Sequence, residues 1–146
     1  MRIQSQPRYR NFSLPRNIGN FSGHGGRYMN QRQTNHTEMV EVHSTIRMLI
    51  PLEKQSEALG ILGAVCAKIQ FDPNCISTHL YRGVDDVLAI MLEERWTSDE
   101  HMLQHLQSDA YHRILLVIEM AEEPPEIRFD RIMHTGGVET IEKARC

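Results

Sequence analysis

The sequence predicts an α+β domain whose segments follow one another in the order β-α-β-β-α-β. Three observations carry this prediction. Four short segments alternate apolar and polar residues, as strands with one buried face do. Two longer segments repeat apolar residues every three or four positions, as helices packed on one side do. Capping motifs and Pro-containing breaks separate these segments.

The first strand and the first helix follow directly from Met39. Alternation over residues 42–50 predicts a strand. Its expected inner face consists of Val42, Ser44, Ile46, Met48 and Ile50. Pro51 suits the first helical position, where its missing N–H costs nothing. The residues with helical spacing are Ala58, Leu62, Val65 and Ile69, and the stretch "FDPN" at 71–74 ends the helix.

The second and third strands are expected at 75–83 and 87–96, joined by a turn at "VDD" into an antiparallel hairpin. In the second strand, Ile76, Thr78 and Leu80 are expected to share one face. The third strand is apolar on both faces along most of its length, which predicts burial on both sides. Helices cover only one side of such a sheet, so a second copy of the chain is expected on the other side, in a two-fold dimer.

A broken helix and a final strand complete the domain. Thr97 and Glu100 form a capping box, and Ser108 offers a second cap before the helix stops at "EEPP". The apolar residues expected on its inner face are Met102, Leu103, Leu106, Ile114, Leu115, Val117, Ile118 and Ala121. The segment 126–134 alternates as a fourth strand. This is the ferredoxin-like plan, an antiparallel sheet with helices on one face.

Charge divides the chain into segments of opposite sign. Residues 1–38 carry six bases and one acid (+5), whereas residues 39–146 carry ten bases and eighteen acids (−8). The Arg/Asn/Ser/Gly-rich segment 1–38 is interpreted as a disordered leader, with a cleaved targeting segment or a spurious start as alternatives. The domain is expected over 39–134 and a tail over 135–146. The negative net charge of residues 39–146 argues against nucleic acid as a partner.

The sequence also predicts the cellular compartment of the protein. No run of about 18 apolar residues exists, so no membrane span is expected. The N-terminus lacks the apolar region of a secretory signal. The cysteines Cys66, Cys75 and Cys146 fit no metal or redox spacing. Free thiols without a secretory route predict a reducing, cytoplasmic compartment.

Three neighbouring residues are the main candidates for a site. Trp96 is either a core anchor or the wall of a pocket that stacks on a planar ligand. His105 is either a structural histidine or a general base, because imidazole titrates near neutral pH. Glu94 shares the apolar face of Trp96 and therefore needs a partner, such as His105 or Arg95 of the partner subunit. His101 and His105 are spaced for a metal, but no third ligand accompanies them.

Three stretches carry a family resemblance: "EERW" at 93–96, "TSDEHMLQHLQSDAYHR" at 97–113 and "EEPPEIRF" at 122–129. In these stretches the sequence resembles the antibiotic biosynthesis monooxygenase family, the dimeric α/β-barrel proteins that include quinol monooxygenases. The resemblance covers residues 39 to about 134. It implies a homodimer with one pocket per subunit, between the helices and the sheet.

The resemblance also implies an activity. Some members oxidise phenols or quinols with O2 and without metal or flavin, since a deprotonated phenol can reduce O2 directly. Another branch degrades haem with an asparagine on strand one, a tryptophan on strand three and a histidine on the next helix. Trp96 and His105 match the last two, whereas "VEVHSTIRM" at 40–48 offers no asparagine.

These expectations define a leading function and two alternatives. The leading one is a cofactor-independent monooxygenase that acts on a small phenolic or quinol compound. Its expected catalytic residues are His105 and Trp96, and its expected substrate-binding residues are Glu94, Tyr111 and His79. No metal is expected. The alternatives are a dimer that binds a small ligand without catalysis, and a protein that binds or degrades haem.

Overall fold

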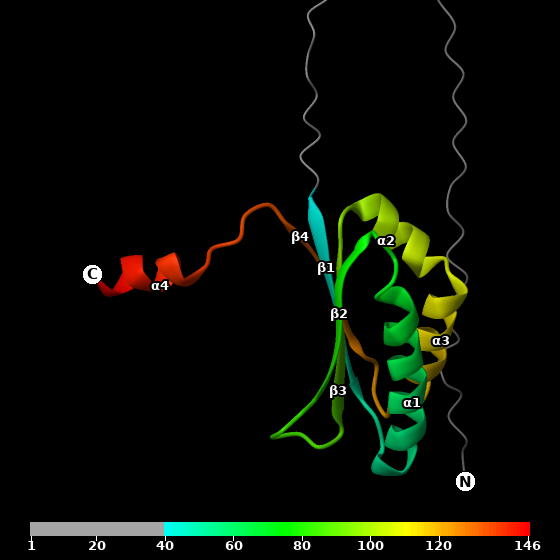
Figure 1. Cartoon of the computed structure of the whole chain (residues 1–146). Helices are drawn as coiled ribbons and strands as arrows, with labels where there is room; N and C mark the ends of the chain where they lie inside the picture. Colours follow the sequence, from blue (N-terminus) through cyan, green and yellow to red (C-terminus); the bar gives the residue numbers. More distant parts are fainter. Residues whose placement is uncertain (1–39) are drawn as a thin grey trace, which may run out of the picture. The chain divides into compact units, whose positions relative to one another are not determined.

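The computed structural model describes residues 40–146 as a four-stranded sheet with helices α1, α2 and α3 on one face (Figure 1). The strand order is β2-β3-β1-β4, and every neighbouring pair is antiparallel. The predicted leader lies outside the described residues. The elements are β1 (Glu41–Leu49), α1 (Leu52–Ile69), β2 (Cys75–Arg82), β3 (Ala89–Trp96), α2 (Asp99–Leu106), α3 (Asp109–Ile118), β4 (Glu126–Ile132) and α4 (Val138–Arg145). The predicted α+β, ferredoxin-like fold is confirmed.

The hydrophobic core lies between the sheet and α1–α3. The residues predicted for the inner face of the first strand are all buried: Val42 and Met48 in β1, and Ile50 directly after it, are fully buried. The predicted α1 stripe is buried too, from Ala58 to Ile69. Burying a side chain of the size of valine or isoleucine stabilises a fold by about 1.5–3 kcal/mol. Periodicity therefore identified the inner face of both elements correctly.

A buried glutamine ties α1 to the hairpin. Gln55 is 4 % exposed, and its Nε2 donates to the carbonyl oxygens of Ile50 (3.0 Å) and Val87 (2.7 Å). Its Oε1 accepts from Arg82 Nη2 at 3.0 Å. Buried amides need such partners. The helix begins at Leu52, one residue later than predicted, with Pro51 in the N-cap position.

A β-bulge corrects the expected faces of β2. Cys75 pairs with Trp96 and Ser77 pairs with Arg95, so Ile76 is an extra residue without a partner on β3. As a result Ile76 is 41 % exposed and does not share the inner face of Thr78 and Leu80. One inserted residue shifts every earlier side chain to the opposite face. The alternating pattern gave no sign of this insertion.

The broken helix predicted after β3 is two helices, α2 and α3. Its first N-cap differs from the prediction, because Ser98 rather than Thr97 caps α2: Ser98 Oγ accepts from the backbone N–H of His101. Ser108 caps α3 as predicted, accepting from the N–H of Tyr111. The buried residues of α2 are Met102 and His105, whereas Leu103, which was expected on the inner face, is 52 % exposed.

The outer face of the sheet, which carries no helix, is only partly apolar. On β3, Ala89 is 7 % exposed and Met91 is half-buried, but the same face continues with Glu93 and Arg95. Val87, also expected there, precedes the strand and is 57 % exposed. In the single chain the outer face of β3 is buried only in part, and its burial by a second copy stays a prediction. No helix within residues 40–146 has the length and apolar character needed to cross a bilayer.

Two glycines on α1 offer a stability prediction. A Cβ at Gly60 or Gly63 would meet no atom within 4 Å, and glycine is roughly 1 kcal/mol less favourable than alanine inside a helix. Gly60→Ala and Gly63→Ala are therefore expected to raise the free energy of unfolding by about 0.5–1 kcal/mol each, measured by urea unfolding.

The matched contrast is Gly83→Ala in the β2–β3 connection. A Cβ there would clash with the backbone oxygen of Asp86, which itself accepts from the N–H of Ala89. This substitution is expected to destabilise the domain. Equal effects at the helix and hairpin glycines would contradict the geometry.

Candidate functional site

A polar cluster is buried between β3 and α2. The inner face of β3 holds Glu94 (2 % exposed) and Trp96 (1 %), and α2 contributes His105 (6 %). Trp96 Nε1 donates to Glu94 Oε2 at 3.3 Å, and His105 Nε2 lies 3.2 Å from both oxygens of that carboxylate. The indole and imidazole rings stack with centroids 4.5 Å apart. Of the partners expected for Glu94, the structure shows His105.

This pairing defines the tautomer of His105. An ionised carboxylate only accepts hydrogen bonds, so the imidazole donates to Glu94 from Nε2. In the neutral ring, the lone pair then resides on Nδ1. A carboxylate behind an imidazole in this way orients it and stabilises its protonated form.

Tyr111 and two cysteines surround the cluster. The Tyr111 ring meets the His105 ring edge-on at 5.4 Å and is 7 % exposed. Burial, and then the charge of Glu94, raise the pKa of Tyr111 to about 12. The same two causes raise the pKa of Cys75 to about 11, and burial also raises that of Cys66. All three groups therefore remain protonated at neutral pH.

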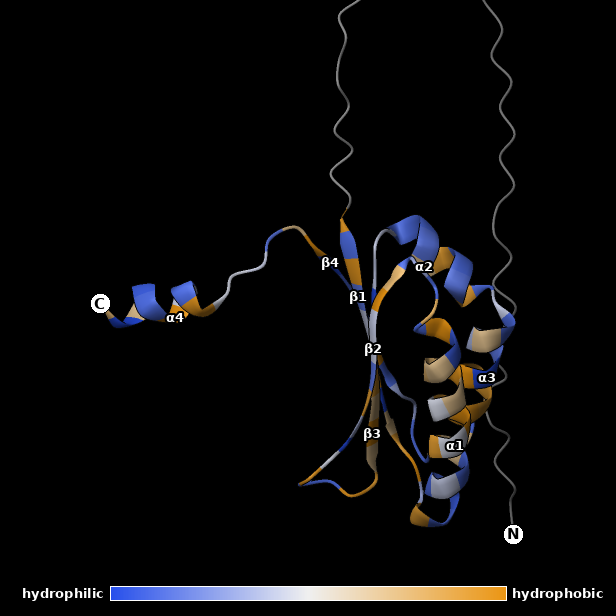
Figure 2. Cartoon of the chain, viewed as in Figure 1, coloured by the Kyte–Doolittle hydropathy of each residue, from blue (hydrophilic) through white to orange (hydrophobic). Residues whose placement is uncertain are grey.

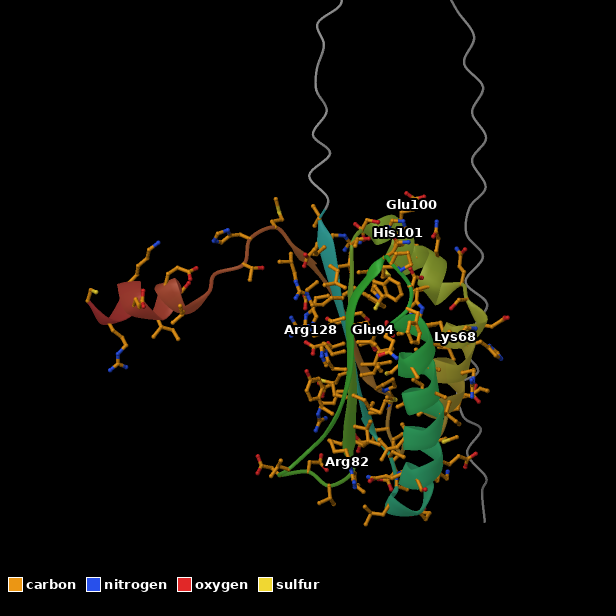
Figure 3. All side chains as sticks on the ribbon, viewed as in Figure 1. Lys68, Arg82, Glu94, Glu100, His101 and Arg128 are labelled. Atoms are coloured by element: carbon orange, nitrogen blue, oxygen red, sulfur yellow. The ribbon has the colours of Figure 1, made fainter. Side chains whose placement is uncertain are left out.

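A pocket of about 630 Å³ borders this cluster at one point, His105. Its other walls come from the C-terminal end of α1, the α1–β2 loop and the junction of α2 with α3. The polar lining residues outside the cluster are Lys68, Asp72, Asn74, His101, Gln104, Ser108 and Asp109. Figure 3 shows His101 at one end of the sheet and Arg82 at the other. The volume lies within the range of small-molecule sites, about 300–1,000 Å³.

His101 stands in the pocket wall one turn before His105. Its Nδ1 lies 2.9 Å from both Thr97 Oγ1 and Ser98 Oγ. These contacts fix the ring through one nitrogen, which leaves Nε2 as its other polar atom. Within residues 40–146, no group of three or more His, Cys, Asp or Glu side chains is arranged to hold a metal ion.

The predicted site residues divide among three places. His105 lines the pocket, whereas Glu94, Trp96 and Tyr111 lie behind it in the core. His79 lies on the outer face of the sheet, where its Nδ1 is 3.9 Å from Glu93 Oε2, and the structure does not bring it to the others. The catalytic role of Trp96 stays a prediction.

Sequence reasoning missed the wall that α1 and its following loop supply. Lys68 and the loop residues Asp72 and Asn74 are nearly thirty positions or more from the next lining segment, which begins at His101. The break "FDPN" was the available signal, because loops held between regular elements often line sites. It was used only as the end of a helix.

Comparison with known proteins identifies the family. The model of the family described as antibiotic biosynthesis monooxygenase matches residues 39–115, which is 77 of 146 residues and more than half of the chain. The chain belongs to the antibiotic biosynthesis monooxygenase family. The matched region contains the whole buried cluster and the pocket wall. No curated protein matches this chain.

Solved structures of this antibiotic biosynthesis monooxygenase fold are similar to the chain at low identity. A protein from Mycobacterium tuberculosis is 20 % identical with a TM-score of 0.60, over 66 % of this chain and 99 % of its own. A conserved protein from Methanosarcina mazei is 19 % identical with a TM-score of 0.59, over 64 % and 93 %. A structure of an antibiotic biosynthesis monooxygenase is 13 % identical with a TM-score of 0.58, over 64 % and 99 %. At these identities the likeness shows the fold.

Proposed function

We propose that this protein is a cofactor-independent monooxygenase that oxidises a small phenolic or quinol compound with O2 in the pocket beside His105. The observation that carries the proposal is the pairing of His105 with the buried Glu94 at the pocket wall. Membership of a family described by its monooxygenase activity supports the reaction type. The substrate class follows the resemblance to quinol monooxygenases, and a general base beside the pocket is consistent with it.

His105 Nδ1 is the general base in this proposal. Removing the proton from a phenol leaves a phenolate, which is far more easily oxidised. The proton goes to Nδ1, and the carboxylate of Glu94 stabilises the resulting imidazolium through Nε2. Positioned general bases contribute roughly 10²–10⁴-fold to a rate.

The overall reaction balances without an external reductant. A hydroquinone and one O2 contain the same atoms as a hydroxylated quinone and one water. The substrate therefore supplies the electrons that reduce O2. The protein binds the ring, accepts its proton and limits the access of water.

The residues present do not fit a haem iron. His105 Nε2 is engaged by Glu94, and the histidine is 6 % exposed. β1 contains no asparagine, and the polar residue on its inner face is the buried Ser44. These features favour His105 as a proton acceptor rather than as an axial ligand of haem iron.

The proposal includes a homodimer formed through the outer face of the sheet. Charged groups on this face already pair with one another, and this pairing lowers the free-energy cost of burying them in an interface. Glu93 Oε1 is 2.6 Å from His43 Nε2, and Glu93 Oε2 accepts from Tyr81 OH at 2.8 Å. Arg95 pairs with Glu41 on the same face.

Oxygen uptake with a panel of hydroquinones tests the function. Replacement of the base, His105→Asn, is expected to lower substrate-dependent uptake at least 100-fold, because asparagine does not accept the phenol proton. The matched control is His112→Asn, since His112 is exposed on α3 and does not line the pocket; its activity should equal that of the wild type.

Two outcomes would contradict the proposal. In the first, the wild-type protein shows no substrate-dependent oxygen uptake but is still thermally stabilised by a ligand. This result would indicate a binding module. The other is a His105→Asn variant with the wild-type rate. A Soret band on haem titration that His105→Asn alters would favour haem as the ligand.

A further inference from the structure

The helix α2 contributes little to the core and much to the pocket. Five of its eight residues are acidic, Gln or His, and most of the helix has the hydrophilic colour in Figure 2. Its buried residues are Met102 and His105. A helix that buries so few side chains turns most of its polar groups outward. Three polar residues of α2 line the pocket: His101, Gln104 and His105.

The two histidines of α2 lie one turn apart. Residues at positions i and i+4 of a helix share a face, with their Cβ atoms about 5–6 Å apart. His105 directs Nε2 to Glu94, whereas His101 is held through Nδ1. Both side chains line the same pocket. The nitrogen atoms that remain for a ligand are therefore Nδ1 of His105 and Nε2 of His101.

Two hydroxyl groups fix the ring of His101. Its Nδ1 lies 2.9 Å from Thr97 Oγ1 and 2.9 Å from Ser98 Oγ. A hydroxyl group donates and accepts, so these contacts are satisfied in either tautomer of the imidazole. Ser98 Oγ also accepts from the backbone N–H of His101, which ties the residue to the start of the helix. A side chain that is already held in place loses less conformational entropy when a ligand binds.

Most other polar side chains of the pocket are less well placed for a ligand. Asp72 Oδ1 and Ser108 Oγ each accept from a backbone N–H. Three further side chains are exposed, those of Lys68, Gln104 and Asp109. The side chain of His101, by contrast, is partly buried and oriented by its neighbours.

An aromatic ring with two hydroxyl groups suits this pair of nitrogen atoms. When the ring lies across the two histidines, one hydroxyl group donates to Nδ1 of His105, the proposed base. The second hydroxyl group bonds to Nε2 of His101 as a donor or as an acceptor, because a hydroxyl group has both capacities. A phenol without a second oxygen leaves Nε2 of His101 without this partner.

We propose that His101 is a second substrate-binding residue, whose Nε2 holds the second ring oxygen while His105 accepts the proton of the first. This inference rests on the proposed pocket and base, and it adds a residue that decides which phenols bind well. A site that hydrogen-bonds a hydroxyl group discriminates against analogues that lack it.

NMR titration of the full-length protein with hydroquinone and with 4-methylphenol tests the inference. The two compounds differ in the second oxygen, and anaerobic conditions prevent turnover. The quantity compared is the ratio of their dissociation constants. His101→Asn is expected to lower the preference for hydroquinone about five- to tenfold relative to the wild type, because one hydrogen bond is lost.

Matched variants separate this contact from a structural role of His101. The amide of asparagine takes the place of Nδ1, so His101→Asn keeps a polar group beside Thr97 and Ser98 but has none at Nε2. The amide of glutamine takes the place of Nε2, so His101→Gln should recover most of the preference. His112→Asn, which is exposed and outside the pocket, should keep the wild-type ratio. Thermal unfolding checks that each variant folds.

The imidazole of His101 supplies a direct second readout. Its ¹⁵N resonances are assigned by their loss in His101→Asn. The Nε2 resonance should shift when hydroquinone binds and should move much less with 4-methylphenol. Equal shifts with both compounds would contradict a bond to the second oxygen.

The remaining outcomes separate this inference from the proposed function. An equal loss of affinity for both compounds in His101→Asn, or an unchanged ratio, would overturn the role of His101, while oxygen uptake would still support the chemistry. The expected change in ratio without oxygen uptake by the wild type would keep the His101 contact and remove the monooxygenase. A wild-type protein that binds neither compound would overturn both.

Discussion

Replacing Glu94 with alanine is expected to destabilise the domain by about 3–5 kcal/mol, because it removes one member of a buried, charged network. Glu94 is the only acceptor in the described chain for Trp96 Nε1, and it also pairs with His105 Nε2. Without it, two buried donors lose their partner, and a methyl group does not fill the space. Urea unfolding monitored by far-UV circular dichroism measures the loss.

Glu94→Gln is the matched control. The amide keeps the volume and one acceptor oxygen but loses the charge, so a smaller loss of stability is expected. Because the charge of Glu94 contributes to the raised pKa values of Tyr111 and Cys75, both values should fall in this variant. Tyrosine ¹³Cζ shifts and the pH dependence of thiol reactivity report these changes. A full-sized loss of stability in Glu94→Gln would indicate that the charge, rather than packing and hydrogen bonding, stabilises the site.

The wild-type domain should lose stability in the alkaline range for the same reason. A group whose folded pKa is raised contributes stability that is fully present below its unfolded pKa. That contribution disappears as pH rises through the folded pKa. For Cys75 the window runs from 9.0 to about 11, and for Tyr111 from 10.0 to about 12. In Glu94→Gln these pH ranges should be narrower, and the domain should lose less stability at alkaline pH.

Trp96→Ala should be comparably severe, with a loss of about 3–5 kcal/mol. The indole is 1 % exposed and stacks on His105, so its removal leaves a cavity beneath the ring proposed as the base. Since Trp96 does not line the pocket, its effect on oxygen uptake should pass through the position of His105. Chemical unfolding must be followed by circular dichroism, because the variant has no tryptophan to report fluorescence.

Trp96→Phe separates packing from the hydrogen bond. Phenylalanine keeps an aromatic ring against the imidazole but cannot donate to Glu94. We expect an intermediate loss of stability and an intermediate rate of oxygen uptake. Alanine substitution of both Trp96 and Glu94 should cost less than the sum of the single effects, since the two side chains contact each other. Strict additivity would contradict a single cooperative cluster.

The sequence predicted the candidate site in part. Trp96, Glu94 and His105 were recognised as a group, and the pairing of Glu94 with His105 was one of the alternatives. His105 was expected on the flank of the apolar face formed by Met102, Leu103 and Leu106. In the structure Met102 and His105 form the buried face of α2 instead. Which side of such a short helix faces the core is decided by its packing against the rest of the fold.

The element order and the inner faces of β1 and α1 were readable from the chain alone. Periods of two and of 3.6 residues decide which side chains can be buried together, and both periods are local properties. The position of the pocket, the place of His105 in its wall and the bulge in β2 became known only from the folded chain. They depend on contacts between segments that are distant in the sequence and on a single-residue shift in register, and a local pattern is insensitive to both.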